Sequence, residues 1–157
     1  MPNILLTRID NRLIHGQVGM TWVNWLGANL VLVADDILAA DEVQQNLMDM
    51  ALPNGVQSRY FTLQKTIDII HKAADHQKIF LVCRTAQNVL TLVEGGVPIK
   101  EVNVGNLHFA EGKKQISKTV SVDENDIQCF KALAEKGVTC TMQGTPDDAK
   151  KDILSIL

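Results

Sequence analysis

The sequence predicts an α/β fold in one domain, with a mainly parallel, twisted open sheet and helices on both faces. Two observations lead to this prediction. Uninterrupted apolar runs such as Leu30–Val33 and Ile79–Cys83 are typical of strands that are buried on both faces. These runs alternate with segments whose apolar residues recur at helical spacing, as in right-handed βαβ units. The chain has 157 residues without a linker, repeat or low-complexity tract, so we expect a single domain.

The predicted strands are short apolar or β-branched runs bounded by polar or glycine-containing turns. They cover residues 4–6, 30–33, 56–63, 79–83, 101–104, 119–122 and 138–142. The interval from Glu101 to Val122 breaks the alternation because its two strands leave no room for a helix between them. We therefore expect one of these two strands to be antiparallel, at or near an edge of the sheet.

The predicted helices follow from apolar spacing and from end signals. Val18–Leu26 stops at Gly27, a residue suited to a left-handed C-cap. A second, amphipathic helix starts at Asp41 and is closed by the turn Pro53-Asn54-Gly55; its apolar stripe is formed by positions 43, 47 and 50. Further helices are expected around residues 67–74, 87–93 and 124–136, and after residue 146.

Composition excludes several classes of function. The formal net charge is −3 and no basic stripe is present, which argues against a nucleic-acid-binding protein. No apolar run approaches the ~20 residues of a membrane span, and the N-terminus lacks a signal-peptide pattern. We therefore expect a cytoplasmic protein that touches a membrane only through partners. Cys83, Cys129 and Cys140 are widely spaced and odd in number, as expected of reduced thiols.

The segment Arg8–Val18 is the main candidate for function. We expect it to form a loop between the first strand and the first helix, at the sheet edge where α/β proteins bind ligands. It contains two arginines, a carboxylate and an imidazole. Arginines and helix-opening N–H groups bind phosphate oxygens, and a neutral histidine is nucleophilic. The segment predicts handling of a phosphoryl group, although His15 could instead be a histidine packed at a strand–helix junction.

Two sequence blocks carry a resemblance to a known family. The first is Arg-Ile-Asp-Asn-Arg-Leu-Ile-His-Gly-Gln-Val at residues 8–18. The second is Val-Asn-Val-Gly-Asn-Leu-His-Phe at residues 102–109, followed by Gly112-Lys113 and Val120-Ser121-Val122. Both resemble IIB components of the mannose/fructose/sorbose family of bacterial sugar phosphotransferase systems, and the resemblance covers the chain almost end to end. Stretches 43–48 and 61–65 resemble the N-acetylgalactosamine or galactosamine branch more than the mannose branch.

The resemblance implies a phosphocarrier enzyme, a protein-N(π)-phosphohistidine–sugar phosphotransferase, with residues 1–157 as one IIB domain. It would accept a phosphoryl group from a IIA protein or domain on His15 and transfer it to N-acetylgalactosamine or galactosamine during uptake through the membrane components IIC and IID. No cofactor and no metal are expected. A homodimer is allowed, but the residues do not decide it. The rivals are a regulatory or binding module that grips a phosphorylated ligand with the same loop, and a receiver-like domain phosphorylated on Asp36.

The resemblance implies a role for His15 and for the residues expected to bind the phosphoryl group. His15 would attack phosphorus, and Arg12 would hold phosphoryl oxygens with its planar guanidinium. Gly16 would leave space for the group, and the N–H groups of Gly16, Gln17 and Val18 would stabilise its charge.

Two further roles stay open. Asp10 could accept a hydrogen bond from the imidazole of His15 or from Arg12. Arg8 could bind phosphate as a second cation or simply occupy the strand end.

Other polar residues are weaker candidates. Asp35 and Asp36 follow the second strand rather than the first, so we interpret them as loop residues beside the site and not as a magnesium pocket. The segment Gly105–Lys113 lacks the spacing of a nucleotide-binding loop. His108 could line the site or lie at the surface.

The remaining histidines, thiols and tryptophans are assigned structural roles. His71 and His76 should face solvent on different faces of one helix. The three cysteines, including Cys83, should be core thiols. Trp22 and Trp25 should pack in the core or between helices, unless one is exposed on a partner surface.

Overall fold

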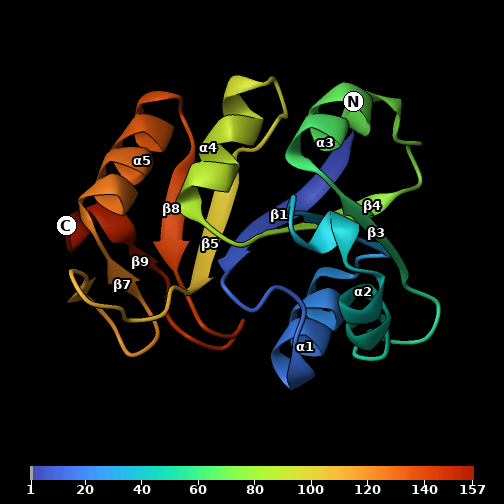
Figure 1. Cartoon of the computed structure of the whole chain (residues 1–157), viewed down its shortest axis with the longest axis horizontal. Helices are drawn as coiled ribbons and strands as arrows, with labels where there is room; N and C mark the ends of the chain where they lie inside the picture. The colour runs from blue at the N-terminus through green and yellow to red at the C-terminus, as the bar shows by residue number, and fades with distance from the viewer. Residues whose placement is uncertain (1) are drawn as a thin grey trace.

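A seven-stranded sheet with the order β3-β2-β4-β1-β5-β8-β9 forms the centre of the molecule (Figure 1). The computed structural model describes residues 2–157, apart from the side chains of Gln17 and Val18. All neighbouring strands are parallel except β8 and β9. The predicted mainly parallel sheet with helices on both faces is confirmed. The strands are β1 (Asn3–Asp10), β2 (Leu30–Ala34), β3 (Gln57–Phe61), β4 (Lys78–Cys83), β5 (Glu101–Asn106), β8 (Thr139–Met142) and β9 (Lys151–Asp152).

The helices cover the two faces of the sheet unequally. Helices α1 (Gly16–Leu26) and α2 (Glu42–Asp49) lie on one face, and α3 (Leu63–Ile69), α4 (Ala86–Glu94) and α5 (Glu124–Glu135) lie on the other (Figure 1). One core cluster, centred on Trp22, packs under α1; a larger one, which includes Phe130, packs under α4 and α5. Strands β2 and β4 contribute side chains to both clusters, as expected for strands buried on both faces.

Local signals in the sequence set the helix ends. Gly27 has φ 68° and its N–H bonds to the carbonyls of Val23 and Asn24, which confirms the predicted C-cap of α1. Thr85 caps α4, and Asp123 forms a reciprocal capping box with Asp126 at the start of α5. Among the described residues, no helix has both the length and the apolar character needed to cross a bilayer.

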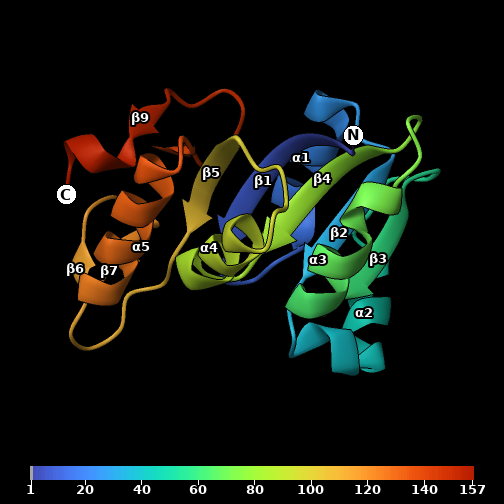
Figure 2. The same ribbon diagram turned by 90° about the horizontal axis from the view of Figure 1, so that it is seen from above.

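The prediction for Glu101–Val122 was wrong in detail. The strands after β5 leave the main sheet and form a separate antiparallel ribbon, β6 (Lys114–Gln115) and β7 (Ser121–Val122), which lies beside α5 in Figure 2. These two strands pair with each other, so they take no place in the seven-stranded sheet. The antiparallel strand of the main sheet is instead β9.

The predicted C-terminal helix is also wrong. After Pro146 the chain forms strand β9 and then one 3-10 turn, η3 (Ile153–Ser155). The preceding stretch Asp147–Asp152 is almost entirely charged, so it offers no apolar stripe that a helix could bury. Backbone pairing of β9 with β8 and full burial of Ile153 hold this segment instead.

Helix α2 is present but turned away from the expected orientation. Its predicted apolar stripe, Val43, Leu47 and Met50, is 69%, 54% and 81% exposed. The core contacts come instead from Met48 and from residues 51–52 after the helix. The helix also ends at Asp49, before the predicted turn at Pro53-Asn54-Gly55.

The strand order places a topological switch point at the carboxyl ends of β1 and β4. The connection from β1 to β2 runs through α1 on one face, and the connection from β4 to β5 runs through α4 on the other. Ligand sites of open α/β sheets lie where connections diverge in this way. Asp10 ends β1 and Arg84 directly follows β4, so both residues lie at this switch point.

Candidate functional site

The predicted functional loop is shorter than expected. Arg8, Ile9 and Asp10 belong to β1, and α1 begins at Gly16, so only residues 11–15 form the loop. The strand extends this far because residues 7–10 pair with β5 on one side and residues 7–9 with β4 on the other.

Burial and backbone geometry shape this loop. Leu13 and Ile14 are buried in the core cluster under α1, while His15 stays half-buried at the rim. Leu13 adopts φ 60°, a left-handed conformation that costs a branched residue about 1–2 kcal/mol. Such a conformation persists only where the surrounding contacts impose it.

The carboxylate of Asp10 contacts three other residues of the site. Its side chain is fully buried, and its Oδ2 lies 2.9 Å from Nε2 of His15. The backbone N–H of Arg12 donates to Oδ1 at 2.9 Å, and the guanidinium of Arg8 donates to Oδ2 from Nε and Nη2. Of the two roles left open for Asp10, the structure shows the contact with the imidazole, whereas Arg12 contributes its backbone rather than its guanidinium.

Since Asp10 faces Nε2, a neutral His15 has its proton on that nitrogen and the lone pair on Nδ1. The hydrogen bond therefore selects the tautomer and orients the ring. The side chain of His15 is 17% exposed, so the ring borders solvent.

Arg8 lies behind Asp10, away from the surface. It is 3% exposed, and it donates to Oδ1 of Asn103 and to the carbonyls of Gln143 and Gly144. Burial lowers the pKa of Arg8, and the carboxylate of Asp10 partly offsets this effect. A buried guanidinium with these partners does not match the phosphate-binding role considered for Arg8; it supports Asp10 from behind.

The pocket of Arg8 depends on two neighbours that the sequence did not reveal as site residues. A Cβ on Gly105 would overlap the guanidinium, so only glycine fits opposite it. The ring of Trp22 lies 5.4 Å from the guanidinium carbon of Arg8, and its Nε1 donates to the carbonyl of Gly144.

Arg12 and the start of α1 form the exposed side of the site. Arg12 is exposed, and within the described part of the chain its guanidinium makes no hydrogen bond or ion pair. Gly16, with φ 46°, opens α1 beside His15. The backbone of Gln17 and Val18 continues this first turn, where N–H groups lack helical partners; their side chains lie outside the described residues.

A second network ties the loop to neighbouring strand ends. Arg84 binds both carboxylate oxygens of Asp35 at 2.9 and 3.0 Å. Asn11 bridges Arg84 and the backbone of His108. Asp35 is thereby occupied by an ion pair, and Asp36 accepts from the backbone of Leu63 at the start of α3.

The other candidates are either core residues or exposed at the surface. Cys83 is fully buried and burial raises the pKa of its thiol; Cys129 and Cys140 are also buried, as predicted.

The remaining histidines, His71, His76 and His108, are exposed. Trp25 is 61% exposed, unlike Trp22, and its ring packs edge-on against that of Trp22. Within residues 2–157, no group of three metal-ligating side chains comes together.

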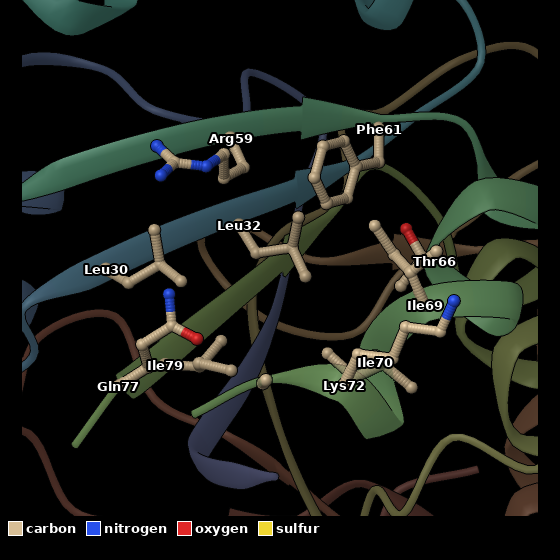
Figure 3. Close-up of a pocket in the computed structure, with 11 residues that line it drawn as sticks. Leu30, Leu32, Arg59, Phe61, Thr66, Ile69, Ile70, Lys72, Gln77 and Ile79 are labelled. Atoms are coloured by element: carbon tan, nitrogen blue, oxygen red, sulfur yellow. The ribbon is translucent and has the colours of Figure 1, made fainter. Parts of the chain in front are cut away.

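The cavity at His15 is small, and a larger cavity lies elsewhere in the fold. The cavity that includes His15 and Asp10 measures only ≈ 10 Å³. A cavity of ≈ 290 Å³ lies between β2–β4 and α3, and Figure 3 shows its mainly apolar lining with Arg59 and Lys72 at its rim. The residues that line this second cavity include no carboxylate and no imidazole, unlike the loop around His15.

Comparison with known proteins decides the family. The family model described as PTS system sorbose subfamily IIB component, where PTS stands for phosphotransferase system, matches residues 4–157. The chain belongs to this IIB family. As an IIB component of a sugar phosphotransferase system, it has a phosphotransferase role.

Relatives of this IIB component are similar over its full length. The N-acetylgalactosamine-specific phosphotransferase enzyme IIB component 2 of Escherichia coli is 59% identical and covers 100% of both chains. The crystal structure of an N-acetylgalactosamine IIB component from Streptococcus pyogenes has a TM-score of 0.95 at 42% identity, covering 100% of this chain and 99% of that one. The mannose-specific EIIAB component of Escherichia coli is 35% identical over 97% of this chain, which spans 47% of that longer protein.

Proposed function

We propose that this IIB component carries a phosphoryl group on His15, which it receives from a IIA protein or domain and transfers to N-acetylgalactosamine or galactosamine. The observation that carries the proposal is the 2.9 Å contact between Asp10 and Nε2 of His15, because it leaves Nδ1 as the nucleophile. The alternative, a module that only binds phosphorylated ligands, does not need an imidazole held in one tautomer.

In the first step, the lone pair on Nδ1 attacks phosphorus on the phosphohistidine of IIA. An Nδ1–P bond forms while the donor N–P bond breaks, and the donor imidazole leaves with the electron pair. No proton is transferred, so the phosphorylated ring of His15 is cationic and keeps its Nε2 proton. Buried Asp10, one hydrogen bond away, stabilises this cation.

In the second step, a sugar hydroxyl attacks the same phosphorus. The Nδ1–P bond breaks and its electron pair returns to the imidazole, while the hydroxyl proton passes to a base outside His15. Arg12 would hold the equatorial oxygens in both steps, since its guanidinium is exposed beside the loop. The small Gly16 and the N–H groups of Gly16, Gln17 and Val18 would complete the charge stabilisation.

The proposed partners follow from the same geometry and from the relatives. A fused EIIAB relative supports a IIA donor, and IIC and IID would present the sugar at the membrane. The ≈ 10 Å³ cavity at His15 is far too small for a sugar, which supports a membrane partner as the source of sugar selectivity. We place the protein in the cytoplasm, attached to the membrane only through these partners.

Intact-mass measurement tests the proposal. The wild type and His15→Ala are incubated with phosphoenolpyruvate, the general phosphocarrier proteins and a charged IIA, and then treated with acid. We expect one acid-labile phosphoryl group on the wild type and none on the variant. An equal label on His15→Ala, or a label resistant to acid, would exclude His15 as the carrier.

A further inference from the structure

We propose that Asn11 is a positioning residue for phosphoryl transfer, and that the ion pair of Arg84 with Asp35 holds it in place. This inference rests on the proposed function of His15. Within the described residues, the side chain of Asn11 makes no hydrogen bond to His15 or Arg12; it acts on the loop that presents the imidazole.

All four polar atoms of Asn11 have partners on neighbouring segments. Its N–H donates to the carbonyl of Asn106 at 3.0 Å, and its Nδ2 donates to the carbonyl of Arg84 at 2.9 Å. Its Oδ1 accepts from the backbone N–H of His108 at 2.6 Å, and its carbonyl accepts from Nη1 of Arg84 at 3.4 Å. Asn11 therefore joins the start of the loop to the ends of β4 and β5.

Arg84 can serve this bridge because Asp35 orients it. Nε and Nη2 of the guanidinium bind the carboxylate of Asp35, which leaves Nη1 directed at Asn11. The hydrogen bonds with Asp35 raise the pKa of Arg84, so its guanidinium stays protonated. Asp35 also accepts from the backbone of Leu38, so the network reaches from β2 across β4 to the loop.

The loop needs this support because its backbone is strained at Leu13. On the β1 side, the carbonyl and carboxylate of Asp10 hold the N–H groups of Leu13 and Arg12. The side chain of Asn11 adds a bond to the carbonyl of Arg84 after β4 and a bond from the N–H of His108 after β5. Without the side chain, only the backbone bonds of Asn11 to Asn106 and Arg84 hold the loop on that side, and small displacements of a reacting group reduce transfer rates steeply.

Asn29 offers a matched control. Its Nδ2 donates to the carbonyl of His76 at 2.8 Å and its Oδ1 accepts from the N–H of Lys78 at 2.7 Å. Like Asn11, it bridges a backbone carbonyl and a backbone N–H of other segments. However, it precedes β2 at the amino end of the sheet, away from His15. Removing either side chain should lower thermal stability, but only Asn11 should affect transfer.

The test is single-turnover transfer from phospho-IIA, with the saturating rate and the half-saturating concentration of IIA measured separately. We expect Asn11→Ala to lower the saturating rate at least about tenfold with the half-saturating concentration unchanged within about twofold. Asn11→Asp keeps the shape and the acceptor but loses the donor to Arg84, so it should be slowed as well. Asn29→Ala should transfer at the wild-type rate.

Variants of Arg84 keep the inference testable if Asn11→Ala does not fold. Arg84→Lys retains a cation for Asp35 and should keep more of the rate than Arg84→Met. A wild-type saturating rate in both Asn11 variants would overturn the inference, and so would an equal loss in Asn29→Ala or a change confined to the half-saturating concentration. In each of these results the wild type is still labelled on His15, so the proposed function stands. A wild type without label would overturn both.

Discussion

Replacing Asp10 with asparagine should destabilise the phosphorylated form of the protein relative to the unmodified form, in addition to any loss of folding stability. The carboxylate lies 2.9 Å from Nε2 and is buried, so it interacts with the cationic ring of the phospho form with little screening. Asparagine can occupy the same space but carries no charge. The phosphorylated form should therefore lose stability relative to the unmodified form.

The size of this effect follows from the ion pair that only the phosphorylated form makes. Asp10 already accepts a charge-assisted hydrogen bond from the neutral ring, and two unit charges about 4 Å apart add about 4 kcal/mol at an effective dielectric constant of about 20. Because the ring borders solvent, we take about 1.4 kcal/mol as the lower bound of the loss, which corresponds to at least about a tenfold fall in the equilibrium constant for phosphorylation by IIA. Intact mass at defined ratios of phospho-IIA to IIA measures this constant directly.

Two companion variants separate this effect from general destabilisation. Asp126 is also a buried aspartate, in the capping box of α5, so Asp126→Asn should reduce thermal stability and leave the constant unchanged. Asp10→Asn leaves Arg8 buried without a carboxylate, and the double variant Arg8→Met/Asp10→Asn should regain stability but not phosphorylation. A fall below twofold in Asp10→Asn, or an equal fall in Asp126→Asn, would refute the reasoning.

Three further predictions test other parts of the site. Arg12→Lys should slow transfer about tenfold, because an ammonium cannot hold two oxygens as the guanidinium does; a single-turnover rate equal to wild type would contradict this. Gly105→Ala should destabilise the protein by about 1–3 kcal/mol, since its Cβ would overlap the guanidinium of Arg8, and urea unfolding would measure the loss. The native protein should resist alkylation at Cys83 and Cys140 at pH 8, because burial raises the pKa of Cys83 and raises that of Cys140 to about 12. Both thiols should react in urea, and rapid modification of the native protein would show that they are not core residues.

The central elements could be predicted because single segments carry their signals. Leu30–Val33 is apolar throughout, as a strand buried on both faces requires, and Gly27 ends α1 in a left-handed conformation that favours glycine. The orientation of α2 could not be predicted, since the stripe Val43, Leu47 and Met50 has the same period whether it faces the core or solvent.

The surroundings of His15 depend on contacts between distant segments. Arg8 pairs in register with Asn103 across β1 and β5, and the register shifts between Ile9 and Asp10 opposite Gly105. Neither the strand pairing nor the register shift can be predicted from the residues that are adjacent in sequence. The partners of Asn11 at positions 84, 106 and 108 are equally remote, so the motif revealed its chemistry but not the network behind it.

The most direct test of the account is nuclear magnetic resonance of the phosphorylated protein with ¹⁵N-labelled histidine. We expect a phosphoryl group on Nδ1 of His15, with a proton on Nε2 that stays hydrogen-bonded to Asp10. A phosphoryl group on Nε2 would require the ring to leave Asp10, and a phosphoryl group on Asp36 or on a cysteine would replace His15 altogether. Either result would contradict the mechanism.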